Sequence, residues 1–345
     1  MMKIAILCGG ISLERNVSLA GGKAVNDALY KLGHLPIMFD PALGKDAILN
    51  SSNIPIIDTP PSIEDLKQYK IKNFIDCFNI PLWDKIEMAF VVMHGKYGED
   101  GVIQALLEAR GIPYTGSGVK ANAIGIDKNT SKLLFVSSGL TVPQWFPVRP
   151  RYYEDYDYLK AIRAELGKRI VIKPNDQGSS VGISIIEDGN IDEIMKAVKN
   201  AAQYSDLVIA EKYIEGREIT VGVINGQVLP VVEIITNEGY YDYQHKYQKG
   251  HTSYECPANL PEDIAEFAQN MALTAYYAIG CEGFARVDFR LNDDGVPFVI
   301  EINTIPGFTA TSLIPMAAKE VGYDFEQLCQ HIINITAEKT NAKNK

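Results

Sequence analysis

The sequence predicts a multidomain α/β protein that opens with a parallel sheet, and three observations support this. An apolar strand is expected at 3–8, a helix at 15–32 and a second apolar strand at 35–39, an order typical of parallel sheets. A further buried strand at 88–93 continues the alternation. The chain has 345 residues, more than the roughly 250–300 that one hydrophobic core serves. We therefore expect two or three domains.

The composition is that of an ordinary globular protein and excludes several classes. Hydrophobic residues make up 46% of the chain and charged residues 22%, which argues against disorder. The formal net charge is -10, so neither nucleic acid nor a membrane surface is expected as a partner. No apolar run approaches the roughly 18–20 residues that span a bilayer.

The five cysteines favour a reducing compartment. Their number is odd, they are scattered, and no C-x-x-C occurs, which is typical of reduced thiols. The N-terminal run MMKIAILCGG is too short for a secretory signal and fits a first strand and its turn. The expected location is therefore the cytoplasm.

The other elements follow from apolar periodicity and turn residues. The stretch 41–86 has few periodic runs and is interpreted as a surface elaboration with short elements. A polar, tyrosine-rich loop at 236–259 is predicted to be a lid, and the tail after 336 is expected to fray. Helices are expected at 102–110, 119–125, 129–138, 156–166, 190–203, 261–279 and 323–336, and strands at 169–173, 182–186, 207–213, 218–224 and 228–235.

A hairpin at 283–303 carries the strongest chemical signal. If a four-residue loop closes it, Arg286 lies opposite Glu301 and Asp288 opposite Val299. The alternation then gathers polar side chains on one face. The polar face is expected to hold Arg286, Asp288, Glu301 and Asn303, and the apolar face Ala285, Val287, Phe289, Phe298, Ile300 and Ile302.

Two carboxylates and an amide oxygen on one sheet face suit a hard cation. Mg²⁺ takes oxygen ligands and usually keeps several waters and substrate phosphates. The plainer alternative for the same pattern is a solvated sheet face with a cross-strand Arg286–Glu301 pair.

A second signal is the loop K-P-N-D-Q-G-S-S-V-G at 173–182, between two predicted strands. Its glycines let the backbone approach a polyphosphate, and its lysine and hydroxyls add donors. The alternative is an ordinary hairpin loop. Neither a P-loop motif nor a G-x-G-x-x-G after the first strand occurs.

Five motifs in one order give the chain a family resemblance. They are S-L-E-R-N-V-S at 12–18, H-G-x-x-G-E-D-G at 94–101, K-P-x-x-x-G-S-S-V-G at 173–182, Y-D-Y-Q-H-K-Y at 241–247 and E-I-N-T-I-P-G-F-T at 301–309. With these motifs the chain closely resembles the D-alanine–D-alanine ligases of the ATP-grasp superfamily. The resemblance extends from about residue 3 to 336.

The resemblance implies a three-domain ATP-grasp architecture with a Rossmann-like parallel sheet in the N-terminal domain. In that family ATP activates one D-alanine as an acyl phosphate, and the amine of a second D-alanine attacks it. The expected domains are an N-terminal substrate-binding domain at 1–116, a central ATP-grasp domain at 117–213 and a catalytic ATP-grasp domain at 214–345. The resemblance also implies a homodimer.

The resemblance assigns substrate roles residue by residue. Glu14 resembles the carboxylate that holds the first substrate's ammonium, and His94 the histidine near that substrate's carboxylate. Arg286 and the N–H of Gly307 resemble an oxyanion hole. Ser179 and Tyr247 match a hydrogen-bonded group with Glu14, and Ser312 and Leu313 match the site of the second substrate's carboxylate.

Nucleotide and metal roles are implied in the same way. The phosphate-binding lysines match Lys128, Lys173 and, in the lid, Lys246; the adenine pocket matches Glu211, Lys212, Tyr213 and Ile214; the ribose-binding carboxylate matches Glu218. Asp288, Glu301 and Asn303 match the ligands of two Mg²⁺ ions, for which Mn²⁺ could substitute.

Three interpretations of function remain open. The first is ligation of two D-alanines for peptidoglycan precursors, and the second is a sister ligase that joins D-alanine to D-lactate or D-serine. The third is a non-catalytic nucleotide-binding paralogue. The intact set of Glu14, Arg286, Asp288, Glu301 and Asn303 counts against the third, because a lost activity leaves no chemical need for it.

Overall fold

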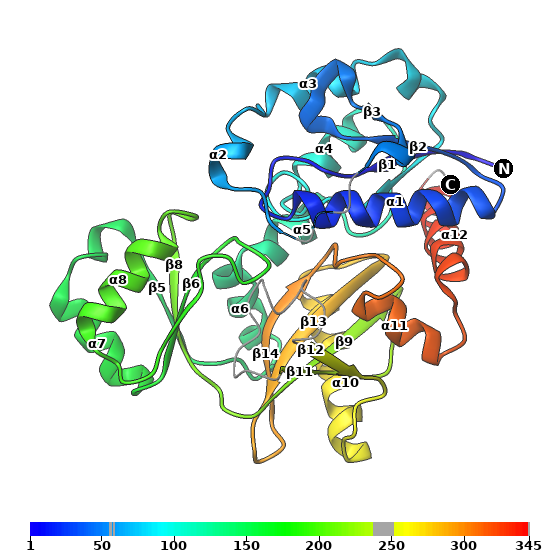
Figure 1. Cartoon of the computed structure of the whole chain (residues 1–345). Coiled ribbons are helices and arrows are strands. Elements are labelled where there is room, and N and C mark those ends of the chain that lie inside the picture. Colours follow the sequence, from blue (N-terminus) through cyan, green and yellow to red (C-terminus); the bar gives the residue numbers. More distant parts are fainter. Residues whose placement is uncertain (55–56, 58, 237–251, 344–345) are drawn as a thin grey trace.

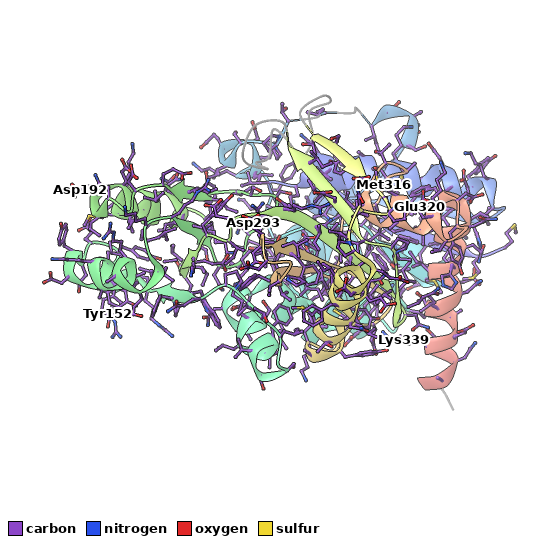
Figure 2. All side chains as sticks on the ribbon, turned by 90° about the horizontal axis from the view of Figure 1, so that it is seen from below. Tyr152, Asp192, Asp293, Met316, Glu320 and Lys339 are labelled. Carbon is purple, nitrogen blue, oxygen red and sulfur yellow. The ribbon has the colours of Figure 1, made fainter. Side chains whose placement is uncertain are left out.

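The computed structural model describes residues 1–54, 57, 59–236 and 252–343, which form three sheets with helices around them (Figure 1). Each sheet lies within one of the three expected domain ranges; the division itself stays a prediction. Figure 2 shows that the lobe with Tyr152 and Asp192 stands apart from the part with Met316 and Lys339. Within the described ranges, no helix is long and apolar enough to cross a membrane.

The first sheet has the strand order β3-β2-β1-β4, and β1 pairs in parallel with both β2 and β4. Helix α1 packs against β1 and β2, so the predicted strand–helix–strand unit is confirmed. Its inward residues, such as Ile4 and Ile6, are fully buried. The bounds are β1 Lys3–Leu7, α1 Arg15–Lys31, β2 Leu35–Phe39, β3 Ile48–Leu49, β4 Met88–Val91 and α4 Val102–Ala109.

The stretch 41–86 is more than the surface elaboration that was expected. It contains β3, α2 (Ile63–Leu66), α3 (Lys72–Phe78) and short 3₁₀ turns. Phe74 and Trp83 are buried in the core under the first sheet, and Trp83 stacks on Phe39 with ring centroids 4.6 Å apart. The short apolar runs show no clear period because they belong to 3₁₀ turns and very short helices. Their apolar side chains nevertheless pack against one face of the first sheet.

The second sheet has the order β5-β8-β6-β7 and carries α7 and α8. Strand β5 was not expected, because its sequence WFPV contains Pro147. Proline is tolerated there because β5 is an edge strand. The bounds are β5 Trp145–Val148, α7 Tyr156–Leu166, β6 Ile170–Pro174, β7 Ser184–Ile186, α8 Ile191–Ala201 and β8 Val208–Lys212.

The third sheet is antiparallel, in the order β12-β11-β9-β13-β14, with β10 paired to β9. Helix α10 packs on β9 and β13, and α5 and α6 pack on β14. Strand β12 lies inside the expected lid loop 236–259, so residues 252–255 of that range form a strand and not a loop. The bounds are α5 Val119–Ile126, α6 Lys128–Ser137, β9 Arg217–Ile224, β10 Gln227–Val228, β11 Val232–Thr236, β12 Thr252–Glu255, α10 Glu262–Ala278, β13 Phe284–Leu291 and β14 Pro297–Asn303.

The hairpin β13–β14 differs from its predicted register. Gly295 has a positive φ of 76° and its N–H bonds to Asn292 O, so the loop has three residues and not four. Leu291 therefore lies opposite Pro297. A bulge between Asp288 and Phe289 shifts the register again.

The bulge changes which residues face each other across the hairpin. Asp288 lies opposite Glu301, and Arg286 opposite Asn303, so the predicted pairs Arg286–Glu301 and Asp288–Val299 are wrong. The four polar residues still share one face, as predicted. Two residues expected on the apolar face leave it: Phe298 lies opposite Arg290, and Ile300 lines a pocket.

The chain ends in two helices, α11 (Leu313–Glu320) and α12 (Phe325–Lys343). Helix α11 was not predicted, and α12 continues through the tail that was expected to fray. Helix α12 packs against α1 at the opposite end of the sequence (Figure 1). Lys31 and Glu326 form an ion pair of 2.6 Å between these two helices.

Candidate functional site

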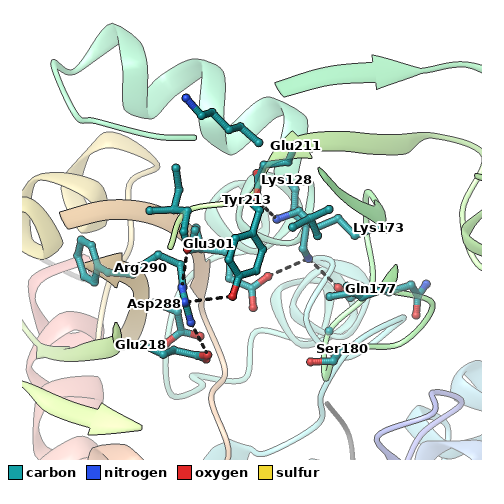
Figure 3. Close-up of a pocket in the computed structure, with 17 residues that line it drawn as sticks. Lys128, Lys173, Gln177, Ser180, Glu211, Tyr213, Glu218, Asp288, Arg290 and Glu301 are labelled. Carbon is teal, nitrogen blue, oxygen red and sulfur yellow. Dashed lines mark hydrogen bonds and ion pairs between the residues drawn. The ribbon is translucent and has the colours of Figure 1, made fainter. Parts of the chain in front are cut away.

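A pocket lies between the second and third sheets and encloses about 830 Å³, part of it open to solvent (Figure 3). Its walls come from α6, from the loop after β6, from the crossing between β8 and β9, and from β13 and β14. The sequence-predicted residues that line it are Lys128, Lys173, Glu211, Lys212, Tyr213, Ile214, Glu218, Asp288 and Glu301.

Three buried charges lie together at one wall of this pocket, which Lys173 and Glu211 line and Lys132 supports from behind. Glu211 on β8 is 2.8 Å from Lys173 on β6 and 2.6 Å from Lys132 on α6. Burial lowers the pKa of Lys132 to about 8, although the Glu211 carboxylate opposes this effect. Burial would raise the pKa of Glu211, but Lys132 and Lys173 outweigh it and hold that pKa below its ordinary value. The group keeps an excess positive charge beside the pocket, which suits an anionic ligand.

Lys128 is a further buried cation at this pocket. Lys128 is 3.0 Å from Glu301 and donates to Gln177 O at 2.6 Å. Burial lowers the pKa of Lys128, but Glu301 more than compensates and the pKa is raised overall. Gln177 belongs to the loop 173–182, so Lys128 links that loop to the Glu301 carboxylate on β14.

The carboxylates of the hairpin are held in a polar group. Asp288 accepts both Nε (2.8 Å) and Nη2 (2.7 Å) of Arg286, and Asn303 Nδ2 at 2.9 Å. Thr220 Oγ1 donates to Asp288 at 2.6 Å. In the part of the chain that the structure describes, no three His, Cys, Asp or Glu side chains gather as a metal cluster. Asp288, Glu301 and the Asn303 amide supply only hard oxygen ligands, which fits Mg²⁺ that keeps its waters and phosphates.

A neighbouring group forms where the loop after β1 of the first sheet meets the loop 173–182 of the second sheet. The side chain of Ser179 donates to Glu14, at the start of α1. A Cβ on Gly178 would lie 2.8 Å from Glu14 Oε2, so a side chain there would displace the Glu14 carboxylate. Ser179 itself has a φ of 50°, an unusual conformation for a residue other than glycine. The loop of the second sheet is thus closed against the first domain at Glu14.

His94 follows β4 and is buried beside this group. Its Nδ1 is 2.7 Å from Ile305 O, while its Nε2 is buried and has no hydrogen-bond partner among the described residues. Burial lowers the pKa of His94, and the nearby charge of Glu14 opposes that effect. With Nδ1 bonded to Ile305 O, Nε2 is the ring atom that remains open to a bound ligand.

Ser312 and Leu313 lie at the N-terminus of α11, reached from β14 through Gly307. Ser312 Oγ accepts the N–H of Thr309 at 2.9 Å, and a Cβ on Gly307 would lie 3.5 Å from that Oγ. The first N–H groups of a helix are suited to bind a carboxylate. Lys246 and Tyr247, which were also predicted as site residues, lie outside the described residues.

Three residues that contribute to this geometry were not identified by the sequence analysis. Lys132 follows Lys128 by one helical turn, a spacing that could have signalled a second inward lysine. Glu99, in the H-G-x-x-G-E-D-G motif, is buried between the first and third sheets. Arg290 lines the pocket from β13, two positions after Asp288, and alternation alone places it on that face.

Comparison with known proteins gives consistent matches over nearly the whole chain. A family model described as "D-ala D-ala ligase N-terminus" matches residues 3–117, and one described as "D-ala D-ala ligase C-terminus" matches 134–334. A D-alanine--D-alanine ligase of Methylacidiphilum infernorum is 42% identical over 333 residues, 96% of this chain and 95% of that protein. One from Gloeobacter violaceus is 40% identical, covering 96% and 99%.

Solved structures agree with these sequence matches. The D-alanine--D-alanine ligase from Bacillus anthracis complexed with ATP superposes with a TM-score of 0.77 at 29% identity, covering 99% of this chain and 100% of that one. The VanG D-Ala:D-Ser ligase from Enterococcus faecalis gives a TM-score of 0.75 at 28% identity, covering 97% and 99%.

Proposed function

The chain belongs to the D-alanine–D-alanine ligase family, and on this premise we propose how its described residues carry out that reaction. The enzyme is an ATP-dependent ligase with the ATP-grasp fold. It joins two D-alanines into D-alanyl-D-alanine, a peptidoglycan precursor, with release of ADP and phosphate. The reaction proceeds through an acyl phosphate of the first D-alanine.

The pocket between the second and third sheets holds ATP. Lys128 and Lys173 face the phosphates, and both are nearly inaccessible to solvent, which strengthens their attraction for an anion. The crossing after β8 borders the base, with Glu211, Lys212, Tyr213 and Ile214, and Glu218 accepts the ribose hydroxyls. The supporting observation is that all of these residues line one pocket.

Asp288, Glu301 and Asn303 would hold two Mg²⁺ ions at the phosphate end. Bound there, the ions would neutralise charge on the transferred phosphoryl group. The chain's own cations act at the same end: Lys128 lies beside Glu301, and Arg286 lies beside Asp288. Mn²⁺ could replace Mg²⁺, since both accept hard oxygen ligands.

The first D-alanine lies at the meeting point of the first sheet and the loop 173–182. Glu14 binds its ammonium, and Ser179 fixes the Glu14 carboxylate through their hydrogen bond. His94 borders the substrate's carboxylate. Lys246 and Tyr247, which the family resemblance also assigns to this end of the site, lie outside the described residues. Exclusion of water matters here, because an acyl phosphate that meets water hydrolyses.

The second D-alanine lies nearer α11. Its carboxylate binds at Ser312 and Leu313, where the helix presents its first N–H groups. Arg286 and the N–H of Gly307 stabilise the oxyanion that forms when the amine attacks. Arg286 must share its guanidinium between this oxyanion and Asp288, its partner in the structure.

One observation carries the proposal: α6, β6, β8, β13 and β14 bring lysines and carboxylates into one pocket. The test is phosphate release with ATP, Mg²⁺ and D-alanine, compared with D-lactate, D-serine and L-alanine, with products identified by mass spectrometry. D-Alanyl-D-alanine is the expected product. A depsipeptide or a D-alanyl-D-serine product as the main one would assign the chain to a sister ligase. No phosphate release with any acceptor would make it a non-catalytic paralogue.

Cellular location and oligomeric state are proposed from the cysteines and from the family resemblance. All five cysteines are free thiols, as in proteins of a reducing cytoplasm. The homodimer rests on the family resemblance and is tested by light scattering of the purified chain. D-Alanine and ATP are the small-molecule partners; neither nucleic acid nor a membrane is proposed, given the net charge of -10.

A further inference from the structure

The chain crosses from the second sheet to the third in the four residues 213–216. Strand β8 ends at Lys212, and β9 begins at Arg217. Tyr213 and Ile214 of this crossing line the pocket, as does Glu218 just after it. The position of the crossing therefore sets one wall of the pocket and the place of Glu218.

Arg290 on β13 holds this crossing at several points (Figure 3). Its Nε donates to Ile214 O at 3.2 Å, and its Nη2 donates to Gly216 O at 2.7 Å. Nη2 is also 3.3 Å from the Tyr213 hydroxyl, and Nη1 is 3.7 Å from Glu218 Oε2. One guanidinium thus reaches every pocket-lining residue of the crossing and the carboxylate beyond it.

The backbone of the crossing is also packed against the end of β13. Gly216 has a φ of 117°, and a Cβ there would lie 2.1 Å from Leu291 O. No side chain can occupy that position, so Gly216 approaches β13 as only glycine can. This close approach brings the Gly216 carbonyl within reach of Arg290.

A second arginine holds the same tyrosine from the other sheet. The Arg169 guanidinium, just before β6, lies 3.8 Å from the Tyr213 ring centroid, and Arg290 lies 5.4 Å from it. Cation–π contacts of this kind restrain a ring at a chosen angle. Tyr213 is therefore fixed by arginines from both sheets that border the pocket.

We propose that Arg290 is a positioning residue for the nucleotide, which holds Tyr213, Ile214 and Glu218 in the places that the base and ribose require. The inference rests on the proposed binding of ATP in this pocket. Because Arg290 acts on the Glu218 carboxylate, it favours a sugar with both hydroxyls over a 2′-deoxy sugar. Arg286, Asp288 and Arg290 alternate along one strand, so one face of β13 serves both the phosphate end and the sugar end of the nucleotide.

The test compares Arg290→Met with a matched control, Arg163→Met. Arg163 also donates to backbone carbonyls, those of Gly189 (3.0 Å) and Asp188 (3.4 Å), and it does not line the pocket. Calorimetry measures ATP binding without D-alanine, and steady-state assays give kcat/KM for ATP and for 2′-deoxyATP. Thermal unfolding checks that each variant is folded.

Arg290→Met is expected to raise the Kd for ATP roughly 10-fold, because two carbonyls and a carboxylate lose a charged donor. Saturating ATP should restore kcat, and the KM for D-alanine should not change. The preference for ATP over 2′-deoxyATP should fall to that of Glu218→Gln. Arg163→Met should match the wild type in all of these.

The outcomes separate this inference from the proposed function. A wild-type protein that binds no ATP would overturn the proposed function, and the inference with it. A wild-type protein that binds ATP, with an Arg290→Met variant of equal affinity and equal sugar preference, would overturn the inference alone. If Arg290→Met does not fold, Arg290→Lys decides: it keeps the charge but cannot span both carbonyls, so an unchanged sugar preference would count against the proposal.

Discussion

The side-chain carboxyl group of Glu99 accepts the backbone N–H of Ile305 at 3.1 Å, although the two residues are 206 positions apart. Glu99 also accepts the N–H of Thr304 at 3.0 Å. His94 meets the carbonyl of the same Ile305. The loop after β4 therefore holds both the N–H and the carbonyl of the segment that leads from β14 to Gly307, and joins the first sheet to the third.

Glu99→Gln is expected to change how stability depends on pH. Burial raises the pKa of Glu99 to about 8, and the charge of Glu14 adds to this effect. Between pH 5 and 8 the folded state then keeps a proton that the unfolded state has lost. Wild-type stability therefore falls as pH rises through this range, by at most about 1.4 kcal/mol per pH unit.

Glutamine has no proton to lose, so the variant should become more stable relative to the wild type from pH 5 to pH 8. Thermal unfolding across that range measures the difference. Glu64→Gln is the control, because Glu64 is an exposed partner of Lys67. Parallel pH profiles for wild type and Glu99→Gln would contradict the buried, protonated state.

Glu301→Gln should abolish turnover while the fold survives. An amide lacks the charge of the carboxylate and cannot bridge two cations in the same way. The expected loss in kcat exceeds about 100-fold, and added Mg²⁺ should not restore it. Steady-state assays at several Mg²⁺ concentrations measure this, with Glu326→Gln, a remote partner of Lys31, as control. A folded Glu301→Gln enzyme with near-normal kcat would exclude the metal role.

Arg286→Ala should lower kcat by roughly 10²–10³ if the guanidinium stabilises the oxyanion. The KM values for ATP and D-alanine should change little, because the oxyanion exists only after attack. Steady-state kinetics with each substrate varied in turn separate the two constants. A rise in KM with kcat intact would instead make Arg286 a substrate clamp.

Glu211→Gln should destabilise the protein far more than Lys132→Met. Without the Glu211 carboxylate, Lys132 and Lys173 are left as buried cations side by side, at a cost of roughly 3–5 kcal/mol. Lys132→Met leaves Glu211 its ion pair with Lys173, so the loss is smaller. Calorimetric unfolding of both variants at pH 7 gives the comparison, and equal stability of Glu211→Gln and wild type would refute it.

The pH dependence of the Glu211→Gln variant provides a second check. Burial lowers the pKa of Lys132 to about 8, below that of the unfolded chain. That value includes the opposing effect of the Glu211 carboxylate, so in Glu211→Gln the pKa of Lys132 falls further. The folded variant then loses this proton below pH 8, where the folded wild type still keeps it. The deficit of Glu211→Gln should therefore shrink as the pH rises towards 8 and stay constant above it.

The sequence predicted most elements of the fold because apolar periodicity can be recognised in one sequence alone. Strand β1, helix α1 and strand β2 follow that periodicity closely, as do β13 and β14. What it missed depends on individual residues: Gly295 shortens a loop, and a bulge lets Ile300 leave the core side of β14. Neither has a signal in hydrophobic alternation, since each shifts the register by one position.

The residues of the candidate site also fall into those that the sequence identified and those that it missed. Lys128, Lys173 and Glu218 were assigned through the family resemblance, Asp288 and Glu301 also through the hairpin pattern, and all five line one pocket. Lys132 and Glu99 escaped notice because a buried charge is recognisable only when its partner is known. Their partners, Glu211 and Ile305, are distant in sequence and meet them only when separate elements of the fold pack together.

The contact of α12 with α1 has a consequence for synthesis on the ribosome. Leu328 and Ile332 of α12 belong to the same core as Ile4, Ile6 and Leu29. The first sheet therefore emerges with this apolar face uncovered, and its cover is translated only after the strands of the other two sheets. At about 5–20 residues per second, that interval is on the order of tens of seconds. During that time the apolar face can be reached by water or by a chaperone, and this core is completed only once α12 has left the ribosome.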